Sequence, residues 1–160
     1  MTRINTIDPS DLTDEWLLAE WRELPRIPNS ILSGKAKIDF KKIPDHYRLG
    51  AGHVMFFYNK LNYLQKRHDL ICKELDKRNI KRDPLVIVDL SSLDNVLRAC
   101  LCKDWQPSQK DHNVNIERLQ ERFDLRKRAY HMTVNNVKQK IDCEHSFNQY
   151  CDQHLKKYYD

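Results

Sequence analysis

The clearest helical pattern in the chain lies at residues 52–77, which read GHVMFFYNKLNYLQKRHDLICKELDK. Apolar residues fall there at positions 56, 57, 63, 64, 70, 71 and 75, which is the spacing of one wide face of an α-helix. A long helix with so wide an apolar face has to be covered by other parts of the chain. We therefore predict one continuous helix over this stretch, at the centre of the hydrophobic core.

The composition around this stretch is that of one helical domain. Hydrophobic residues make up 40% of the 160 residues and charged residues 32%, which suits a globular chain with a single core. Only 3 residues are glycine, which argues against a turn-rich β protein. We expect an all-α fold, a compact single-domain bundle of several helices over residues 1–160.

Two further helices are predicted from local start and stop signals. A helical pattern opens at Ser10 and runs to about Leu24, where two prolines end it. Ser108 followed by Asp111 marks the start of another helix. The apolar stripe of that second helix comprises Ile116, Leu119 and Phe123.

The remaining segments carry weaker patterns. Residues 1–9 are expected to form an extended arm. Residues 84–88 are compatible with either a short strand or an extended stretch, and residues 91–102 with a short helix. The apolar spacing over residues 133–159 predicts a last amphipathic helix.

Charge and cysteine usage bear on the compartment. The net charge of +5 and the pI of about 8.9 are a modest excess, so the positions of the charges matter more than their sum. No run of 18 apolar residues occurs and the first residues contain no apolar signal core, so we expect neither a membrane segment nor secretion. The odd number of cysteines, 5, is typical of reduced thiols in the cytoplasm.

Two cysteines and two histidines near the C-terminus raise two alternatives, a zinc site or ordinary side-chain packing on a helix. Its ligands would be Cys143, His145, Cys151 and His154. Neither pair has the C-x2-C or H-x3-H spacing that is usual for structural zinc. We therefore expect no metal, and interpret these residues as small side chains on a helix.

One carboxylate lies on a largely apolar stripe. Positions 12, 16, 19 and 23 share a face of the helix that begins near Ser10, and the last of them is Glu23. Such a carboxylate either pairs with a cation or lies in a cleft where desolvation raises its pKa. The alternative is an exposed residue at a frayed helix end, paired with a neighbouring arginine.

Arginines recur at helical spacing in two places. Arg22 and Arg26 are four residues apart, and Arg118, Arg122 and Arg126 form a row offset from the apolar stripe of their helix, so the row should face solvent. Guanidinium groups in a row suit the phosphate oxygens of DNA. The alternative is a solvated charged face, which neighbouring glutamates partly neutralise.

The chain start offers a possible nucleophile. Thr2 is small, so we expect removal of the initiator methionine and a free α-amine on Thr2. With a reference pKa near 7.7–8.0, roughly 15% of such an amine is neutral at pH 7, against well under ~0.1% of an ordinary lysine. A terminal amine is therefore suited to forming a Schiff base, although many cytoplasmic proteins share this feature.

Several stretches together resemble a known family. They read MTRIN at residues 1–5, LLAEWRELPR at 17–26 and LGAGHVMFFYNKL at 49–61, with weaker similarity at 66–67, 105–107 and 118–122. In these stretches the chain is similar to the pyrimidine dimer DNA glycosylase and abasic-site lyase family, of the phage endonuclease V type. The resemblance covers residues 1–125, the expected catalytic core, and leaves 125–160 as a divergent C-terminal extension.

The resemblance implies an all-helical fold in which the N-terminal arm lies between helices. It implies that Thr2 supplies the nucleophilic amine and that Glu23 is the catalytic carboxylate. The DNA-binding residues that it implies are Arg3, Arg22, Arg26, Arg118 and Arg122. It implies no metal and no organic cofactor. Residues 50–53 match a tight turn whose small residues would let the arm pass, and His53 is either structural or a partner of the arm.

The implied activity is base-excision repair of double-stranded DNA by a monomer, in the nucleoid of a bacterial or phage-infected cell. The amine would attack C1′ of the damaged nucleotide, the base would leave, and β-elimination would cut the strand. Cyclobutane pyrimidine dimers are the expected lesion. The alternatives are the same chemistry on another damaged or modified base, and a helical DNA-binding protein without activity.

Two departures from the family pattern concern substrate recognition. The family's Gln-His pair before Leu17 is replaced by Glu15-Trp16, and we expect Trp16 to pack in the core. The family's aromatic tail is matched only by the end of the chain, where Tyr158 and Tyr159 are candidates for lesion recognition. The resemblance therefore supports the family's reaction chemistry in this chain more strongly than it supports the family's substrate.

Overall fold

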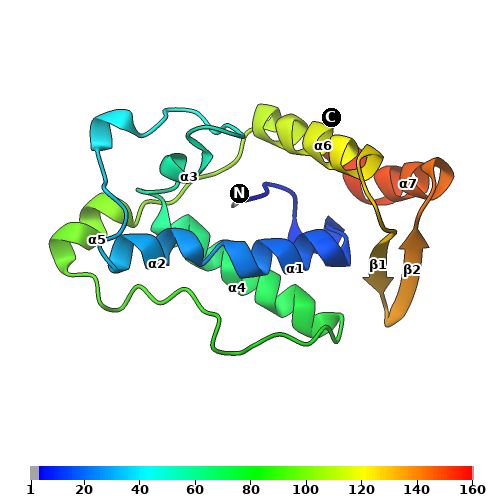
Figure 1. Cartoon of the computed structure of the whole chain (residues 1–160), viewed down its shortest axis with the longest axis horizontal. Helices are drawn as coiled ribbons and strands as arrows, with labels where there is room; N and C mark the ends of the chain where they lie inside the picture. The colour runs from blue at the N-terminus through cyan, green and yellow to red at the C-terminus, as the bar shows by residue number, and fades with distance from the viewer. Residues whose placement is uncertain (1–3, 160) are drawn as a thin grey trace.

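A computed structural model describes residues 4–159 and shows a mainly helical fold with a small β-hairpin at one end (Figure 1). The expectation of an all-α fold is therefore only partly correct. The hairpin consists of β1 (Tyr130–Val134) and β2 (Val137–Ile141), which pair antiparallel. Within the described part of the chain, no helix is long and apolar enough to cross a membrane.

The first helical region is α1 (Asp14–Glu23), preceded by a 3-10 turn over Pro9–Asp11 and followed directly by α2 (Arg26–Leu32). Thr13 caps α1, and Pro25 stands between the two helices. Pro28 lies in the first turn of α2, where its missing N–H removes no intrahelical hydrogen bond. The prolines thus end α1, as predicted, without ending the helical region.

The predicted continuous helix over residues 52–77 is wrong in one respect, because it is broken into α3 (His53–Phe56) and α4 (Leu61–Lys77). Phe56 and Phe57 are consecutive, both are fully buried, and their rings meet edge to face with centroids 5.1 Å apart. Neighbours on one helix point about 100° apart, so the turn lets both rings enter the core. In α4 the expected core stripe is buried at Leu64, Ile71 and Leu75, whereas Leu70, which was predicted on the same face, is 50% exposed.

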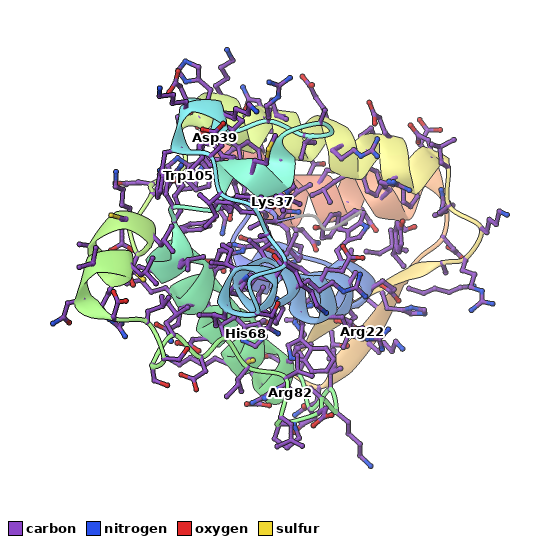
Figure 2. All side chains as sticks on the ribbon, turned by 60° about the vertical axis from the view of Figure 1, so that its left-hand side comes forward. Arg22, Lys37, Asp39, His68, Arg82 and Trp105 are labelled. Atoms are coloured by element: carbon purple, nitrogen blue, oxygen red, sulfur yellow. The ribbon has the colours of Figure 1, made fainter. Side chains whose placement is uncertain are left out.

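The segment between α4 and the next long helix contains one short helix, α5 (Asn95–Leu101), inside the range predicted for it. Residues 84–88 form no strand, and residues 84 and 85 lie in a turn where Val86 N–H donates to the Asp83 carbonyl oxygen over 3.2 Å, so neither alternative describes the whole stretch. Trp105, labelled in Figure 2, ends the segment by stacking on Tyr47 with ring centroids 5.3 Å apart. This contact fastens the segment to the core.

Helix α6 (Gln109–Asp124) begins where the capping signal predicted. Ser108 N–H donates to Asp111 Oδ2 over 2.8 Å, and Asp111 N–H is 3.4 Å from Ser108 Oγ, which completes a capping box. The predicted stripe is buried, and it consists of Ile116, Leu119 and Phe123. Figure 1 shows α6 running antiparallel to α1, on the other side of the N-terminal arm.

The predicted helix over residues 133–159 is wrong for its first part. Asn135 and Asn136 have φ of +50° and +63° and form the turn between β1 and β2. Two left-handed residues between β-branched neighbours are typical of the tight turn that matches strand twist. A short helix, α7 (Glu144–Tyr150), and further helical turns to Tyr158 follow the hairpin.

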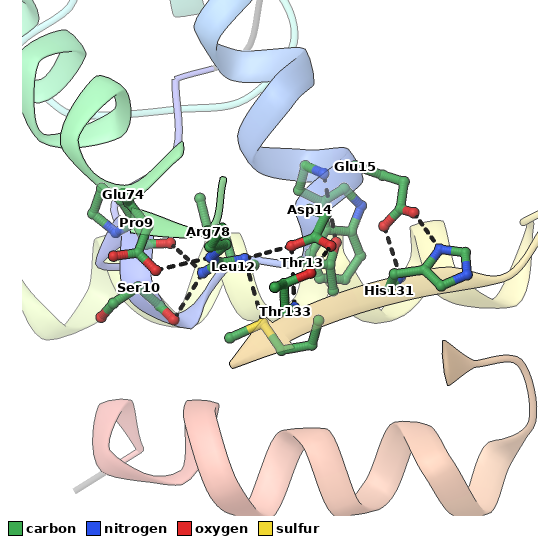
Figure 3. Close-up of polar contacts among 12 residues, drawn as sticks. Pro9, Ser10, Leu12, Thr13, Asp14, Glu15, Glu74, Arg78, His131 and Thr133 are labelled. Carbon is green, nitrogen blue, oxygen red and sulfur yellow. Dashed lines mark hydrogen bonds and ion pairs between the residues drawn. The ribbon is translucent and has the colours of Figure 1, made fainter. Parts of the chain in front are cut away.

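The hairpin is fastened to the start of α1 by side chains (Figure 3). The carboxylate of Asp14 accepts hydrogen bonds from Thr133 N–H over 3.2 Å and from Thr133 Oγ1 over 2.7 Å. The carboxylate of Glu15 accepts from His131 N–H over 2.8 Å and lies 2.7 Å from His131 Nδ1. Glu15, which belongs to the first departure from the family pattern, is thus a partner of the C-terminal extension.

Candidate active site

A cavity of about 420 Å³ lies between α1, α6 and the N-terminal arm. Its walls bring together residues far apart in the sequence. They are Ile4 and Asn5 of the arm, Glu15, Trp16, Ala19, Glu20 and Glu23 of α1, Asn115, Arg118, Leu119 and Arg122 of α6, and Leu49 and Tyr130. The cavity therefore combines carboxylates, arginines and an aromatic end.

The described part of the arm, residues 4–8, runs between α1 and α6 as an extended chain (Figure 1). It belongs to no sheet, so its backbone groups need other partners. Ile4 N–H donates to His53 Nε2 over 2.8 Å, and the hydroxyl of Tyr47 lies 2.8 Å from the carbonyl oxygen of Ile4. Side chains from distant parts of the chain thus provide the hydrogen bonds that a neighbouring strand would otherwise supply to the arm.

A buried ion pair holds the next residues of the arm. Glu20 accepts from Arg67 Nε over 2.8 Å and Nη2 over 2.9 Å, and both side chains are about 95% buried. The same Glu20 carboxylate accepts from Asn5 N–H over 3.0 Å, while Arg67 Nη1 donates to the Ile7 carbonyl over 2.7 Å. These charge-assisted bonds fix the course of the arm into the cavity wall.

His53 is a partner of the arm, which resolves the two alternatives left by the sequence. Its Nδ1 lies 2.8 Å from the carbonyl oxygen of Arg48, so Nδ1 carries the proton and Nε2 accepts from Ile4. Burial lowers the pKa of His53, which keeps the ring neutral and Nε2 free to accept.

The glycines beside His53 serve their own turn, not the passage of the arm. Gly50 and Gly52 have φ of +81° and +89°, which side chains rarely adopt. A Cβ on Gly52 would lie 3.2 Å from the Pro44 side chain, and its nearest neighbours include no residue of the described arm, 4–8. For this part of the arm, the expectation that small residues let it pass is not supported.

Glu23 lies at the C-terminal end of α1 and lines the cavity. Its side chain is half-buried, as expected for a carboxylate in a cleft. Residues Ile4 and Asn5 line the same cavity, so the arm and this carboxylate meet there. Thr2 and Arg3, for which the sequence implied a nucleophile and a DNA contact, lie outside the described residues.

Arg118 and Arg122 line the cavity instead of facing solvent as a free row. Arg118 Nη1 pairs with Glu121 over 2.6 Å. Arg122 Nε is buried and has no hydrogen-bond partner within residues 4–159. A buried donor without an acceptor is costly, so the Arg122 guanidinium is incompletely satisfied within the described structure. Arg126 lies beyond the end of α6, where it donates to two backbone carbonyls.

The remaining predicted residues lie outside the cavity walls. Arg22 and Arg26 are exposed on the surface near the junction of α1 and α2. The hydroxyl of Tyr158 donates to Asp11 over 2.7 Å and accepts from Asp8 N–H over 2.9 Å, so this side chain braces the end of the arm. Tyr159 is 58% exposed.

Two features of the site were missed from the sequence. The ion pair of Glu20 with Arg67 had one signal in the sequence. Arg67 lies three residues after Leu64 and four before Ile71, so it is a charged residue on the apolar stripe of α4 and needs a buried partner. Tyr130 carried none, because it lies in the divergent extension after residue 125, where the resemblance implies no site residue before Tyr158. Trp16, expected in the core, is partly buried and lines the cavity.

Fold and site define a mainly helical protein in which the described part of the N-terminal arm, three glutamates and two arginines share one cavity. A family model described as pyrimidine dimer DNA glycosylase matches residues 1–88, more than half of the 160 residues. The chain belongs to this family. The matched range includes the arm and α1 to α4, whereas α6 and the hairpin lie beyond it.

Proposed function

We propose that this protein is a pyrimidine dimer DNA glycosylase that also cuts abasic sites, with the α-amine of Thr2 as its nucleophile. The supporting observation is the anchoring of Ile4 and Asn5 in the wall of the cavity that Glu23 lines. Thr2 is two residues before Ile4, and two residues of extended chain span at most about 7 Å. The amine is therefore within reach of a nucleotide bound in the cavity.

The positions of the lysines also favour the α-amine of Thr2 as the nucleophile. No lysine is among the described residues that line the cavity. Burial, followed by repulsion from Lys103, lowers the pKa of Lys60 to about 8, but Lys60 Nζ bonds the Phe56 carbonyl over 2.8 Å and lies outside the cavity walls. The terminal amine is thus the better candidate, and its ordinary pKa leaves part of it neutral at pH 7.

The proposed reaction begins with attack of the neutral amine on C1′ of the damaged nucleotide. The bond from C1′ to the base breaks, its electron pair leaves with the base, and the amine nitrogen loses a proton. The C1′–O4′ bond of the sugar ring then breaks, O4′ takes up a proton, and the nitrogen lone pair forms the C=N bond of a protonated imine. Removal of a proton from C2′ then expels the 3′ phosphate by β-elimination. Glu23 is positioned to assist the proton transfers and the opening of the sugar ring.

The arginines supply the binding energy for DNA. Arg118 and Arg122 in the cavity suit the phosphates that flank the reacting nucleotide, and exposed Arg22 and Arg26 suit the neighbouring backbone. The resemblance adds Arg3, which lies outside the described residues, to this set. A cavity of about 420 Å³ suits an extruded nucleotide rather than a duplex, and extrusion is least costly at a damaged step.

Borohydride trapping tests the proposal. The protein is mixed with duplexes that carry a cyclobutane pyrimidine dimer, an abasic site or no damage, and the imine is reduced to a stable adduct. We expect adducts on the first two duplexes only. An adduct on the abasic duplex alone would retain the amine chemistry and assign another base as substrate. No adduct on any duplex, with Met1 shown to be removed, would favour a DNA-binding protein without activity.

A further inference from the structure

The positive charge of the chain is concentrated in the stretch that leads from α2 toward α3. Residues 33–48, the basic segment, hold five lysines and arginines against two aspartates, so they carry +3 of the net charge of +5. All five basic residues are exposed, and they are Lys35, Lys37, Lys41, Lys42 and Arg48. One tenth of the chain thus carries more than half of its net charge, which makes this surface attractive to anions.

The basic segment does not use these charges to hold the fold. Among the described residues, its one ion pair joins Lys42 Nζ to Asp39 Oδ2 over 3.4 Å, and these side chains are 78% and 49% exposed. An exposed pair of this kind contributes little to stability. The segment is fastened by uncharged groups instead. Ala36 N–H donates to the Ser30 carbonyl oxygen over 2.8 Å, and the side chain of Tyr47 is buried in the core.

The cavity between α1 and α6 has no comparable excess of positive charge. Its lining has three glutamates against two arginines, and one of these arginines, Arg118, is paired with Glu121. A polyanion such as DNA therefore gains little net attraction from the cavity itself. For a protein that acts on DNA, most of the attraction has to come from the surface around the cavity.

The basic segment borders this cavity. It begins directly after α2, the helix that opens with exposed Arg26, and the residue that follows the segment, Leu49, lines the cavity. The carbonyl oxygen of Arg48 lies 2.8 Å from Nδ1 of His53, which holds the arm. Figure 1 shows the segment, in cyan, as an arch from the end of α2 toward α3, and Figure 2 labels Lys37 on it. The segment thus connects the exposed arginines near the end of α1 with the cavity.

We propose that the basic segment binds the phosphate backbone of double-stranded DNA beside the cavity, without regard to the bases. This inference rests on the proposed function and adds the surface that holds the intact part of the duplex. A cavity of about 420 Å³ suits a nucleotide and not a duplex, so the neighbouring base pairs have to lie on the outer surface. Lysine ammonium groups bind phosphate oxygens as point charges and carry no sequence information.

Two double variants test the surface, K35Q/K37Q and K41Q/K42Q, each of which removes two charges from the segment. Fluorescence anisotropy measures the affinity of each variant for an undamaged duplex and for a duplex with one pyrimidine dimer, over a series of salt concentrations. The substituted side chains are exposed, so the unfolding temperature should stay at the wild-type value. Two variants are used so that a folding failure in one leaves the other decisive.

The matched control is K73Q/K81Q, which lowers the net charge by the same amount. Lys73 and Lys81 are exposed and lie in and just after α4, whose end Figure 1 shows at the opposite corner of the molecule from the arch. This control separates the loss of phosphate contacts from a general loss of positive charge.

We expect each segment variant to reduce the slope of log affinity against log salt concentration by about 1 to 2, because each phosphate contact contributes about 0.9. Affinity at low salt should fall at least about five-fold, and by the same factor on both duplexes. The control should change affinity by less than about two-fold.

A loss no larger than that of the control, in both segment variants, would overturn the proposed surface. A loss confined to the damaged duplex would also overturn it, because contacts with the phosphate backbone do not depend on the lesion. Wild-type binding to both duplexes without any adduct in the borohydride experiment would instead overturn the proposed enzyme and leave the DNA-binding surface in place.

Discussion

At the scale of single residues, two glutamates on α1 have opposite environments. Glu20 is buried and bonded to Arg67 and to the arm, whereas Glu23, three residues later, lines the cavity at the end of the helix. Three donors hold the Glu20 carboxylate beside the arm, so Glu20 suits positioning, whereas Glu23 lies where a bound nucleotide would react.

Replacement of Glu23 by glutamine separates catalysis from binding. E23Q should release bases at least about 100-fold more slowly, because it removes the group that moves protons, while its affinity for dimer-containing DNA stays near the wild-type value. Single-turnover base release and electrophoretic mobility shifts measure the two effects. Base release at the wild-type rate would show that Glu23 is not the catalytic carboxylate.

Replacement of Glu20 by glutamine addresses the support of the arm. E20Q leaves the Arg67 charge buried and unpaired, which costs about 3–5 kcal/mol in the free energy of unfolding. Urea denaturation measures this loss. The control is E121Q, whose partner Arg118 lies at a partly exposed pair and whose loss should cost less than about 1 kcal/mol. Similar losses in both variants would contradict a supporting role for the buried pair.

At the scale of elements, local sequence signals predicted some elements correctly and others wrongly. The start of α6 was predictable because its cap uses residues three apart. The break between α3 and α4 was not, because it depends on burial of Phe56 and Phe57 together. The apolar spacing predicted a helix where the hairpin lies. The sequence signal for the hairpin was its pair of asparagines, which adopt the left-handed conformation of a tight turn.

Attachment of the C-terminal segment to the first turn of the chain depends on pH. Burial raises the pKa of Asp11, but hydrogen bonds from His154, Lys157 and Tyr158 outweigh it and leave this pKa below its ordinary value. A carboxyl group with a depressed folded-state pKa contributes stability above its unfolded pKa of about 3.9, and this contribution is lost as the pH falls through the folded-state value.

The variant D11N tests this linkage. It should lose at least about 1.5 kcal/mol of unfolding free energy at pH 7, because it removes a charged acceptor of several hydrogen bonds. The difference from wild type should shrink below about pH 4, as Asp11 of the wild type is protonated. Urea denaturation at pH 7, 4 and 3 measures it. A difference that is the same at all three values would exclude the carboxylate as its source.

At the scale of the whole molecule, the arm is held by residues from most of the chain. Ile4, Asn5 and Ile7 bond side chains 49, 15 and 60 residues away. The resemblance predicted Glu23, Arg118 and Arg122, which the cavity brings together. It did not predict the bonds that hold the arm, because partners so far apart leave no periodic trace in the sequence.

Lengthening the chain start by one residue tests the reach of the arm. A glycine placed before Thr2 moves the amine by about 3.5 Å and leaves every bond from Ile4 onward intact. We expect unchanged thermal stability and DNA affinity, with borohydride trapping reduced at least about 100-fold. A variant that traps as well as the wild type would assign the nucleophile to a lysine.

The most direct measurement is the position of the covalent bond itself. The borohydride-reduced adduct with abasic DNA is digested with protease and nuclease, and mass spectrometry locates the modified residue. We predict the sugar remnant on the α-amine of Thr2, in protein from which Met1 has been removed. A remnant on any lysine side chain would contradict the claim that the anchored arm delivers the nucleophile to the Glu23 cavity.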